Sequence, residues 1–502
     1  GGPMTTDEAV GAALGAWATG QRDECLRRLR EIGDAAYDHP LALQLWALCR
    51  GQSADALALL ERAVRIAPGD AQAQFNLGVS LQAAGDLSRA IACYEQALRA
   101  QPDNVGSLNN LSDLLRRRGR AAEGWALMQR YQQAGGDIKG LEIRLAKLAM
   151  DLRRFDDAAH WFARAEAHAP GNASVQWEHA MLTLARGDFR RGWPQYERRL
   201  DCHGLDALGI CPYAFPRWTG EPLNGGSLLL HREQGLGDMI MFASALPAMI
   251  EAGLDLQLAI HPPLARLMAF NFPKTRVWSS ITTAGTGSQP DQRWLAAAPP
   301  IAAQAPICCL GAIRMPDGPP APSAYIRADP DDVARWSDVL AAMAPPRAGV
   351  RRVGLVLGTR QVRWNDDGST NALRKTLPGA SAARLAEAKN VQWIGLHASE
   401  TAAMFADVPG LDIVDPSPWI SDLADTAAII EMLDLVVSAD TAVAHLAGAM
   451  GKPVWLMLWW NPDWRWGIDR EDSYWYPHVR TFRQARMGDW TSVVEAIVKA
   501  LG

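Results

Sequence analysis

A 34-residue period runs through the first two hundred residues, and it restricts this part of the chain to a repeat fold. Gly51, Gly85 and Gly119 are each 34 residues apart, and Gly187 lies 68 residues further on, with Arg153 in the skipped position. A small residue recurs five positions after each of these sites, and prolines fall on the same grid. A period of this length is typical of stacked helix pairs of the tetratricopeptide repeat (TPR) type.

The clearest copy of the repeat covers residues 71–104. Leu77 and Gly78 fall on its first helix, Gly85 forms the turn, and Pro102 ends the unit because proline cannot continue a helix. We therefore predict a TPR α-solenoid over residues 1–205, with about five units after residue 37 and a weaker one before them. Such a solenoid presents a concave face to a protein partner. The alternative is a helical spacer with a purely structural role.

Composition narrows the classes of function. The net charge of -5 and pI near 6.1 disfavour nucleic acid as the main partner, because a phosphate backbone requires a basic surface. Seven cysteines without a C-x-x-C pair argue against a disulfide framework or a zinc site. Neither a signal peptide nor an apolar run long enough to span a bilayer is visible, so we expect no integral membrane segment and a cytoplasmic location. Residues 1–3 resemble a cloning remnant ahead of Met4.

A Gly- and Pro-rich linker at residues 206–226 separates the repeats from a different pattern, in which short β-like runs alternate with helical ones. This alternation predicts parallel sheets covered by helices. We expect one lobe over residues 227–348 and a second over 349–502, with residues 283–323 irregular. The expected strands are Ser227 to His231, Leu256 to Ile260, Arg352 to Gly358, Val391 to Leu396, Leu433 to Ser438 and Val454 to Leu458. The expected helices are 238–252, 262–270, 381–388, 421–431, 440–450 and 489–501.

Two strand-to-helix corners carry the chemical signal. At the first corner, Gly235 and Gly237 permit close backbone approach, and Asp238 opens a helix whose first N–H groups lack partners. Asp238 could equally serve as a helix cap.

The second corner follows the strand that ends at Ser438. Its N–H groups are expected to point out of the carboxyl end of the sheet, where open α/β sheets bind phosphates. Ordinary capping by Ser438, Asp440 or Thr441 is the alternative, and His445 could simply be a packed core histidine. The candidate phosphate-binding residues at this corner are Asp440, Thr441, Ala442, Val443 and His445.

Three separated motifs together resemble a known family. E-Q-G-L-G-D at 233–238 is followed by S-A-D-T-A-V-A-H at 438–445 and by N-P-D-W-R-W at 461–466. In this order they resemble bacterial TPR-fused glycosyltransferases. These enzymes are related to the ADP-heptose lipopolysaccharide heptosyltransferases and are similar in domain plan to O-linked N-acetylglucosamine transferase; some modify flagellin. The resemblance implies a GT-B fold, in which two Rossmann-like lobes bind a nucleotide sugar.

The resemblance also assigns roles. Asp238 matches the family's general base, and Asp440, Thr441 and His445 match the residues at the donor phosphates and sugar. Lys375 matches a cation that could neutralise the leaving phosphate, although a solvated surface lysine is the alternative.

Further loop contacts are expected at Asn365, Asp366, Trp460 and Asp463. The segment Leu357 to Arg360 departs from the family's usual Trp-Ala-Gly-Asn, which leaves the identity of the donor open. Aromatic residues at 464, 466, 475 and 476 could stack on a ligand or pack in the core.

The sequence thus predicts an inverting, metal-independent glycosyltransferase without a cofactor, which transfers a sugar from a nucleotide donor to a hydroxyl of a protein acceptor held by the TPR arm. Two alternatives remain: a TPR adaptor with an inactive transferase domain, and a transferase that acts on lipopolysaccharide or another glycan.

Overall fold

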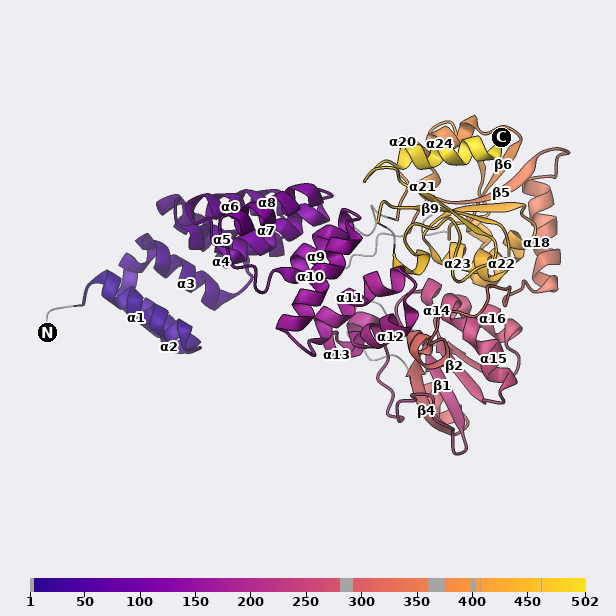
Figure 1. The fold of residues 1–502 in the computed structure, drawn as a ribbon, viewed down its shortest axis with the longest axis horizontal. Helices are drawn as coiled ribbons and strands as arrows, with labels where there is room; N and C mark the ends of the chain where they lie inside the picture. The colour runs from indigo at the N-terminus through magenta and orange to yellow at the C-terminus, as the bar shows by residue number, and fades with distance from the viewer. Residues whose placement is uncertain (1–3, 280–291, 360–374, 399–402, 407, 462) are drawn as a thin grey trace. The chain divides into compact units, whose positions relative to one another are not determined.

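The computed structural model describes residues 4–502 apart from 280–291, 360–374, 399–402, 407 and 462 (Figure 1). The chain forms two compact units. Unit 1 extends to Trp161, and unit 2 begins at Phe162. None of the helices formed by the described residues is long and apolar enough to cross a bilayer.

Unit 1 is a succession of antiparallel helix pairs (Figure 1). The turn glycines Gly51, Gly85 and Gly119 have φ between +71° and +83°, which explains their recurrence, and Arg153 adopts φ 57° at the position without glycine. A Cβ on Gly78 would lie 2.7 Å from the Tyr94 ring, so this glycine allows two paired helices to approach. The helices are α1 (Thr6–Ala18), α2 (Arg22–Ile32), α3 (Pro40–Arg50), α4 (Ala54–Ile66), α5 (Ala71–Ala83), α6 (Leu87–Ala100), α7 (Val105–Arg117), α8 (Ala121–Gln133), α9 (Glu142–Asp151) and α10 (Phe155–His168), with a 3-10 turn η1 (Gly33–Asp38).

Unit 2 begins with the C-terminal end of α10 and three further helices, α11 (Ala173–Ala185), α12 (Phe189–Glu197) and α13 (Arg199–Cys202). Helices α11 and α12 share one apolar core with both sheets of unit 2, and the Trp193 indole donates a hydrogen bond to the Met315 carbonyl at 2.7 Å. The compact division therefore lies about forty residues before the expected boundary at 205. The last helices of the predicted arm are part of the α/β unit.

The first sheet of unit 2 is parallel, with strand order β3-β2-β1-β4. Its strands are β1 (Ser227–His231), β2 (Leu256–Ile260), β3 (Arg276–Ser279) and β4 (Ile301–Pro306). The elements around it are η2 (Leu205–Leu208), α14 (Leu236–Phe242), η3 (Ala243–Ala245), α15 (Leu246–Glu251), α16 (Pro262–Asn271), η4 (Arg293–Ala297), η5 (Ile307–Cys309) and α17 (Leu310–Arg314).

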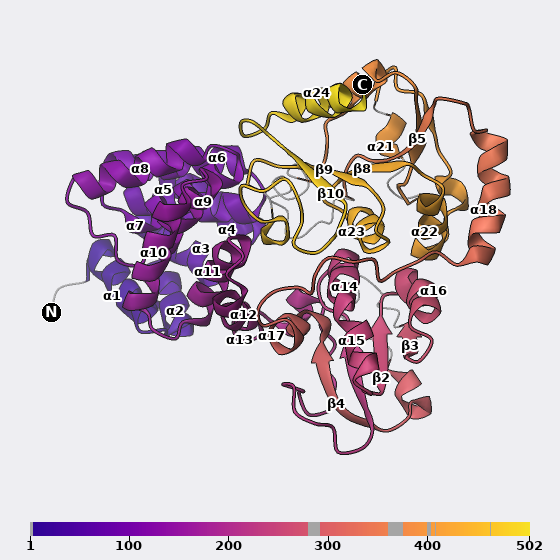
Figure 2. The same cartoon turned by 45° about the vertical axis from the view of Figure 1, so that its right-hand side comes forward.

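The second sheet is also parallel, with order β10-β9-β8-β5-β6-β7, and Figure 2 shows α24 over one part of it and α22 over another. Two parallel sheets in successive lobes confirm the predicted α/β arrangement. The strands are β5 (Arg351–Val356), β6 (Val391–Gly395), β7 (Ile413–Val414), β8 (Leu435–Ala439), β9 (Val454–Leu458) and β10 (Val479–Arg483). The helices are α18 (Pro330–Met343), α20 (Gly379–Ala382), η6 (Ala383–Glu387), α21 (Ala403–Ala406), η7 (Ser417–Trp419), α22 (Leu423–Glu431), α23 (Ala442–Ala449), η8 (Trp464–Trp466) and α24 (Trp490–Leu501).

The expectation of irregular structure over residues 283–323 is wrong for a strand, β4, and for the short helical elements η4, η5 and α17. Strand β4 lies inside this Pro- and Ala-rich segment and pairs with β1, from Ser227 opposite Ile301 to His231 opposite Pro306. Its position explains the error: β4 is the edge of the sheet, where a terminal proline that cannot donate a hydrogen bond is tolerated. Strands β3, β7 and β10 and helix α18 were also not among the expected elements.

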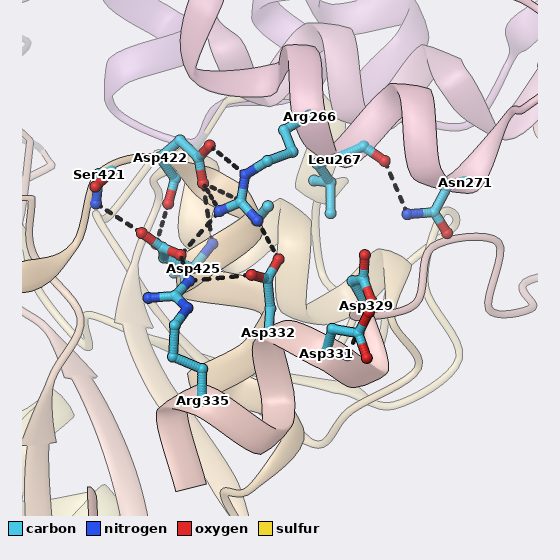
Figure 3. A network of polar contacts seen from close by, with 12 residues as sticks. Arg266, Leu267, Asn271, Asp329, Asp331, Asp332, Arg335, Ser421, Asp422 and Asp425 are labelled. Carbon is cyan, nitrogen blue, oxygen red and sulfur yellow. Dashed lines mark hydrogen bonds and ion pairs between the residues drawn. The ribbon is translucent and has the colours of Figure 1, made fainter. Parts of the chain in front are cut away.

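The two lobes of unit 2 are joined on one side by a network of ion pairs (Figure 3). Arg266 on α16 contacts Asp422 and Asp425, at the start of α22, with both distances 2.8 Å, and it also pairs with Asp332 on α18. Arg335 on α18 reaches the same Asp332 and Asp425. On the other side the lobes meet where α14 packs against α23.

Candidate active site

Asp238 lies in the first turn of α14, at the carboxyl end of β1. One carboxylate oxygen accepts the backbone N–H of Gly235 at 3.0 Å, and the other accepts from the guanidinium of Arg465. The side chain is 13% exposed. The structure thus shows a helix-capping contact, as one interpretation of the sequence expected, and in addition a contact with the second lobe that helix capping does not require.

Arg465 is the residue that connects the two lobes at this point, and the sequence analysis did not select it. It lies on η8, where it also bonds Asp463 at 2.6 Å and the side-chain carbonyl of Gln234 at 3.2 Å. Burial disfavours its charge, but Asp238 and Asp463 outweigh burial and raise the pKa of Arg465 well above its ordinary value. The sequence offered one sign that Arg465 is important, because it is a single cation between two tryptophans, W-R-W.

Asp440 and Lys375 form an ion pair at the corresponding edge of the second sheet, with 2.6 Å between Nζ and Oδ2. Strands β5 and β8 are parallel neighbours, so the segment after β5 and the corner after β8 emerge side by side. Gly358 lies against Thr376, which brings Lys375 to this edge. Burial would raise the pKa of Asp440, but Lys375 lowers it to about 2. The Lys375 side chain is itself 36% exposed, and its partner Asp440 is 10% exposed.

The start of α23 has Thr441 at its N-cap position, and among the described residues no side chain caps this helix. Thr441 Oγ1 instead lies 3.2 Å from Ser438 Oγ, and Asp440 Oδ1 accepts the indole N–H of Trp466 at 2.9 Å. Capping by these residues, the alternative interpretation of the corner, is not what the structure shows. The first N–H groups of a helix have no intrahelical acceptor, so Ala442 and Val443 present theirs at this edge.

His445 lies where α14 and α23 meet. Its Nδ1 is 2.7 Å from the Tyr476 hydroxyl, and its Nε2 is 3.9 Å from Asp440 Oδ1. Burial lowers the pKa of His445 to about 4, so the ring is neutral near pH 7. A Cβ on Gly237 would lie 2.7 Å from this ring, which explains the need for glycine there. Gly237 thus permits helix contact in addition to any role toward a ligand.

The remaining predicted residues divide into three groups. The aromatic side chains of Trp464, Trp466, Trp475 and Tyr476 are at most 4% exposed and belong to the core, as the packing alternative expected. Trp460 is half-buried, and Asp463 is close enough to contribute to the electrostatics of Lys375. Asn365 and Asp366 lie outside the described residues.

The two sheet edges together form one charged cluster. Three carboxylates, on Asp238, Asp440 and Asp463, alternate with two cations, Lys375 and Arg465. No group of three or more potential metal ligands occurs among the described residues. The cluster offers a carboxylate that could accept a proton on one lobe and cations that could bind an anion on the other.

The comparisons with known proteins agree with this organisation. The tetratricopeptide repeat family matches residues 47–87 and 75–137. Protein FlbA of Caulobacter vibrioides is 29% identical over 453 residues, which cover 86% of this chain and 73% of that protein. The cellulose synthase operon protein C of Xanthomonas axonopodis pv. citri is 42% identical over 164 residues, which cover 31% of this chain and 11% of that protein.

Two solved structures are among those that align with parts of this chain. A glycosyl transferase family 9 protein from Veillonella parvula aligns with a TM-score of 0.40 at 11% identity and covers 56% of this chain and 99% of its own. A TPR protein from Thermus thermophilus aligns with a TM-score of 0.29 at 20% identity, over 36% of this chain and 100% of its own. The family match shows that residues 47–137 are tetratricopeptide repeats, within a chain that is similar to FlbA over most of its length.

Proposed function

We propose that this protein is a glycosyltransferase that moves a sugar from a nucleotide-activated donor to a Ser or Thr hydroxyl of a protein acceptor. The observation that carries the proposal is the meeting of two sheet edges. Asp238 follows β1 of the first lobe, the Lys375–Asp440 pair lies at the edge of β5 and β8, and Arg465 bonds Asp238 from the second lobe. Carboxyl ends of parallel strands at a lobe junction are the usual place for ligands in α/β folds.

The residues suit the chemistry of an inverting transfer. The acceptor hydroxyl forms a bond to the anomeric carbon and passes its proton to Asp238, while the bond from that carbon to the nucleoside diphosphate breaks. The negative charge that develops on the leaving phosphate requires cations or N–H donors. Lys375 and the start of α23 provide these groups, and Arg465 provides a second cation.

Unit 1 is the proposed site of acceptor recognition. TPR arrays bind partners along their length. A cavity of about 970 Å³ lies between α6, α7 and α8, and leucines such as Leu98, Leu111 and Leu127 line it. A protein acceptor is therefore favoured over a glycan, and flagellin is a candidate through the family resemblance given above.

Nucleotide binding is the first test. We expect one nucleotide among UDP, GDP, ADP, CMP and dTDP to raise the melting temperature of unit 2, since a ligand at 100 times its Kd stabilises by about 2.7 kcal/mol. Lys375→Gln should remove this shift, because it deletes the cation but retains a hydrogen-bond donor toward Asp440. Lys452→Gln is the matched control, since Lys452 also pairs with a carboxylate, Glu431 at 3.1 Å. It should leave the shift intact.

The absence of a shift with all five nucleotides would contradict the proposal. A normal shift without transfer to any acceptor would favour the adaptor alternative instead.

A further inference from the structure

The turn that carries the strand β1 into α14 has a strained backbone. The backbone of Gln234 has φ 57°, in the left-handed region that residues other than glycine rarely adopt. Such a conformation persists where the surrounding structure holds it in place. The contacts that hold this turn come from helices that precede the first sheet.

Two of these contacts fix Gln234 itself. Its backbone N–H donates to the Leu208 carbonyl at 2.8 Å, and its side-chain amide donates to the Tyr196 hydroxyl at 2.6 Å. Tyr196 lies on α12 and Leu208 on η2, both within the segment that the sequence pattern placed in the arm and linker. The side-chain carbonyl oxygen of Gln234 accepts a hydrogen bond from Arg465, which also donates to Asp238.

The third contact is a buried ion pair one residue earlier in the turn. Arg199 on α13 bonds Glu233 through two nitrogens at 2.5 and 2.8 Å, and both side chains are 0% exposed. Arg199 also donates to the Tyr196 carbonyl at 3.1 Å, so the two residues are linked. We call their contacts with the turn, Tyr196 to Gln234 and Arg199 to Glu233, the bracket. Removing one partner of such a pair leaves an uncompensated buried charge.

We propose that Tyr196 and Arg199 are positioning residues for the transfer reaction. This inference rests on the proposed function of Asp238. The bracket holds residues 233–235, and the Gln234 side chain extends it to Arg465, so the orientation of Asp238 depends on α12 and α13. The last helices before the first sheet are in this account a component of the active site and not a part of the acceptor-binding arm.

The test is Tyr196→Phe, which removes one hydroxyl and leaves the packed ring. We expect kcat to fall roughly tenfold with little change in the KM for the donor, because a small misplacement of a reacting group lowers the rate and not binding. In an Asp238→Asn background the same change should cause no further loss, since residues that act as a unit are not additive.

Tyr94→Phe is the matched control. Tyr94 on α6 is 0% exposed, against 2% for Tyr196, and its hydroxyl also bonds a glutamine side chain, Gln82, at 3.0 Å. It lies in unit 1 and should leave kcat at saturating acceptor unchanged.

A second readout does not depend on activity. Hydrogen exchange of the amides in residues 232–238 should accelerate in Tyr196→Phe and remain unchanged in Tyr94→Phe, because the bracket fixes the Gln234 amide. Unchanged exchange in Tyr196→Phe would overturn the inference whatever the enzyme does, as would an unchanged kcat or an additive loss in the Asp238→Asn background. Faster exchange in a protein that transfers no sugar would contradict the proposed function but retain the bracket.

Arg199 gives an independent check. Arg199→Met should destabilise unit 2, and the double variant Arg199→Met with Glu233→Leu should recover folding, since replacing both charges removes the unpaired one. The refolded double variant should still show a reduced kcat and faster exchange in residues 232–238. Wild-type values for both would overturn the role of the ion pair in positioning.

Discussion

The helices of unit 1 pack mainly against their neighbours in sequence, whereas the candidate site of unit 2 joins residues far apart along the chain. Helix α5 packs chiefly against α4 and α6, but Asp238 and Arg465 are separated by 227 residues. A repeat array is stabilised by local interfaces, so it tolerates the loss of whole units. The site of unit 2 depends on several distant segments at once, and the two regions should respond differently to the same kind of change.

The largest expected difference concerns where the chain is cut. Deletion of residues 4–205 removes Tyr196 and Arg199, so Glu233 loses its ion-pair partner, and it also removes the apolar residues that α11 and α12 contribute to the shared core. We expect this fragment to be unfolded by circular dichroism. Deletion of residues 4–154 retains α10 to α13 and should give a folded unit 2 that binds the nucleotide but no longer modifies the intact protein acceptor. Equal folding of both fragments would show that α11 to α13 belong with the repeats.

The next effect distinguishes a catalytic carboxylate from a structural one. Asp238→Asn should lower kcat by about 10²- to 10⁴-fold through loss of the general base, with the nucleotide-induced shift retained. Arg465 still has Asp463 as a partner at 2.6 Å, so the fold should tolerate the change.

Asp113→Asn in α7 is the counterpart in unit 1, where Asp113 is buried and paired with Arg116 and Arg144. It should lower the stability of unit 1 but leave kcat at saturating acceptor near the wild-type value. Near-normal turnover of Asp238→Asn would show that Asp238 is a helix-capping residue and not the general base.

Acidification should destabilise unit 2. Burial lowers the pKa of His231, His261, His397 and His445 to about 4. Between that value and the unfolded pKa of about 6.5 the unfolded chain binds more protons, so stability falls as pH decreases. The loss at pH 5 is about 2 kcal/mol for each of the three fully buried histidines, His231, His397 and His445. The depressed pKa of Asp440 acts only below about pH 4. Calorimetry of the fragment 155–502 at pH 7 and pH 5 measures this loss, and an unchanged transition temperature would contradict it.

The smallest expected effect is that of a chelator. Since Lys375 and Arg465 can balance the charge of the leaving phosphate, EDTA should change the transfer rate by less than about twofold. Restoration of a lost rate by added Mg²⁺ or Mn²⁺ would show that a metal and not Lys375 performs this role.

The same contrast explains how much the sequence could predict. The repeat period gave the helices of unit 1, and the ranges expected for β1, β2 and β9 agree with the structure. The approach of Lys375 to Asp440 could be expected from motif order, because each lies beside a parallel strand end. Arg465 and the Tyr196–Gln234 contact could not be expected, since no local pattern records which distant side chain meets a turn. Strand β4 was missed because an edge strand accepts a composition that reads as irregular.

The most direct test of the central claim is transfer itself, measured as a change in the intact mass of an acceptor. The full chain is incubated with flagellin and with the sugar donor of whichever nucleotide stabilises unit 2, and Asp238→Asn serves as the control. The account predicts a mass increase of one or more sugar units on Ser or Thr with the wild-type chain and none, within the assay time, with Asp238→Asn. An equal mass increase with both proteins would contradict it, because the transfer would then not depend on Asp238.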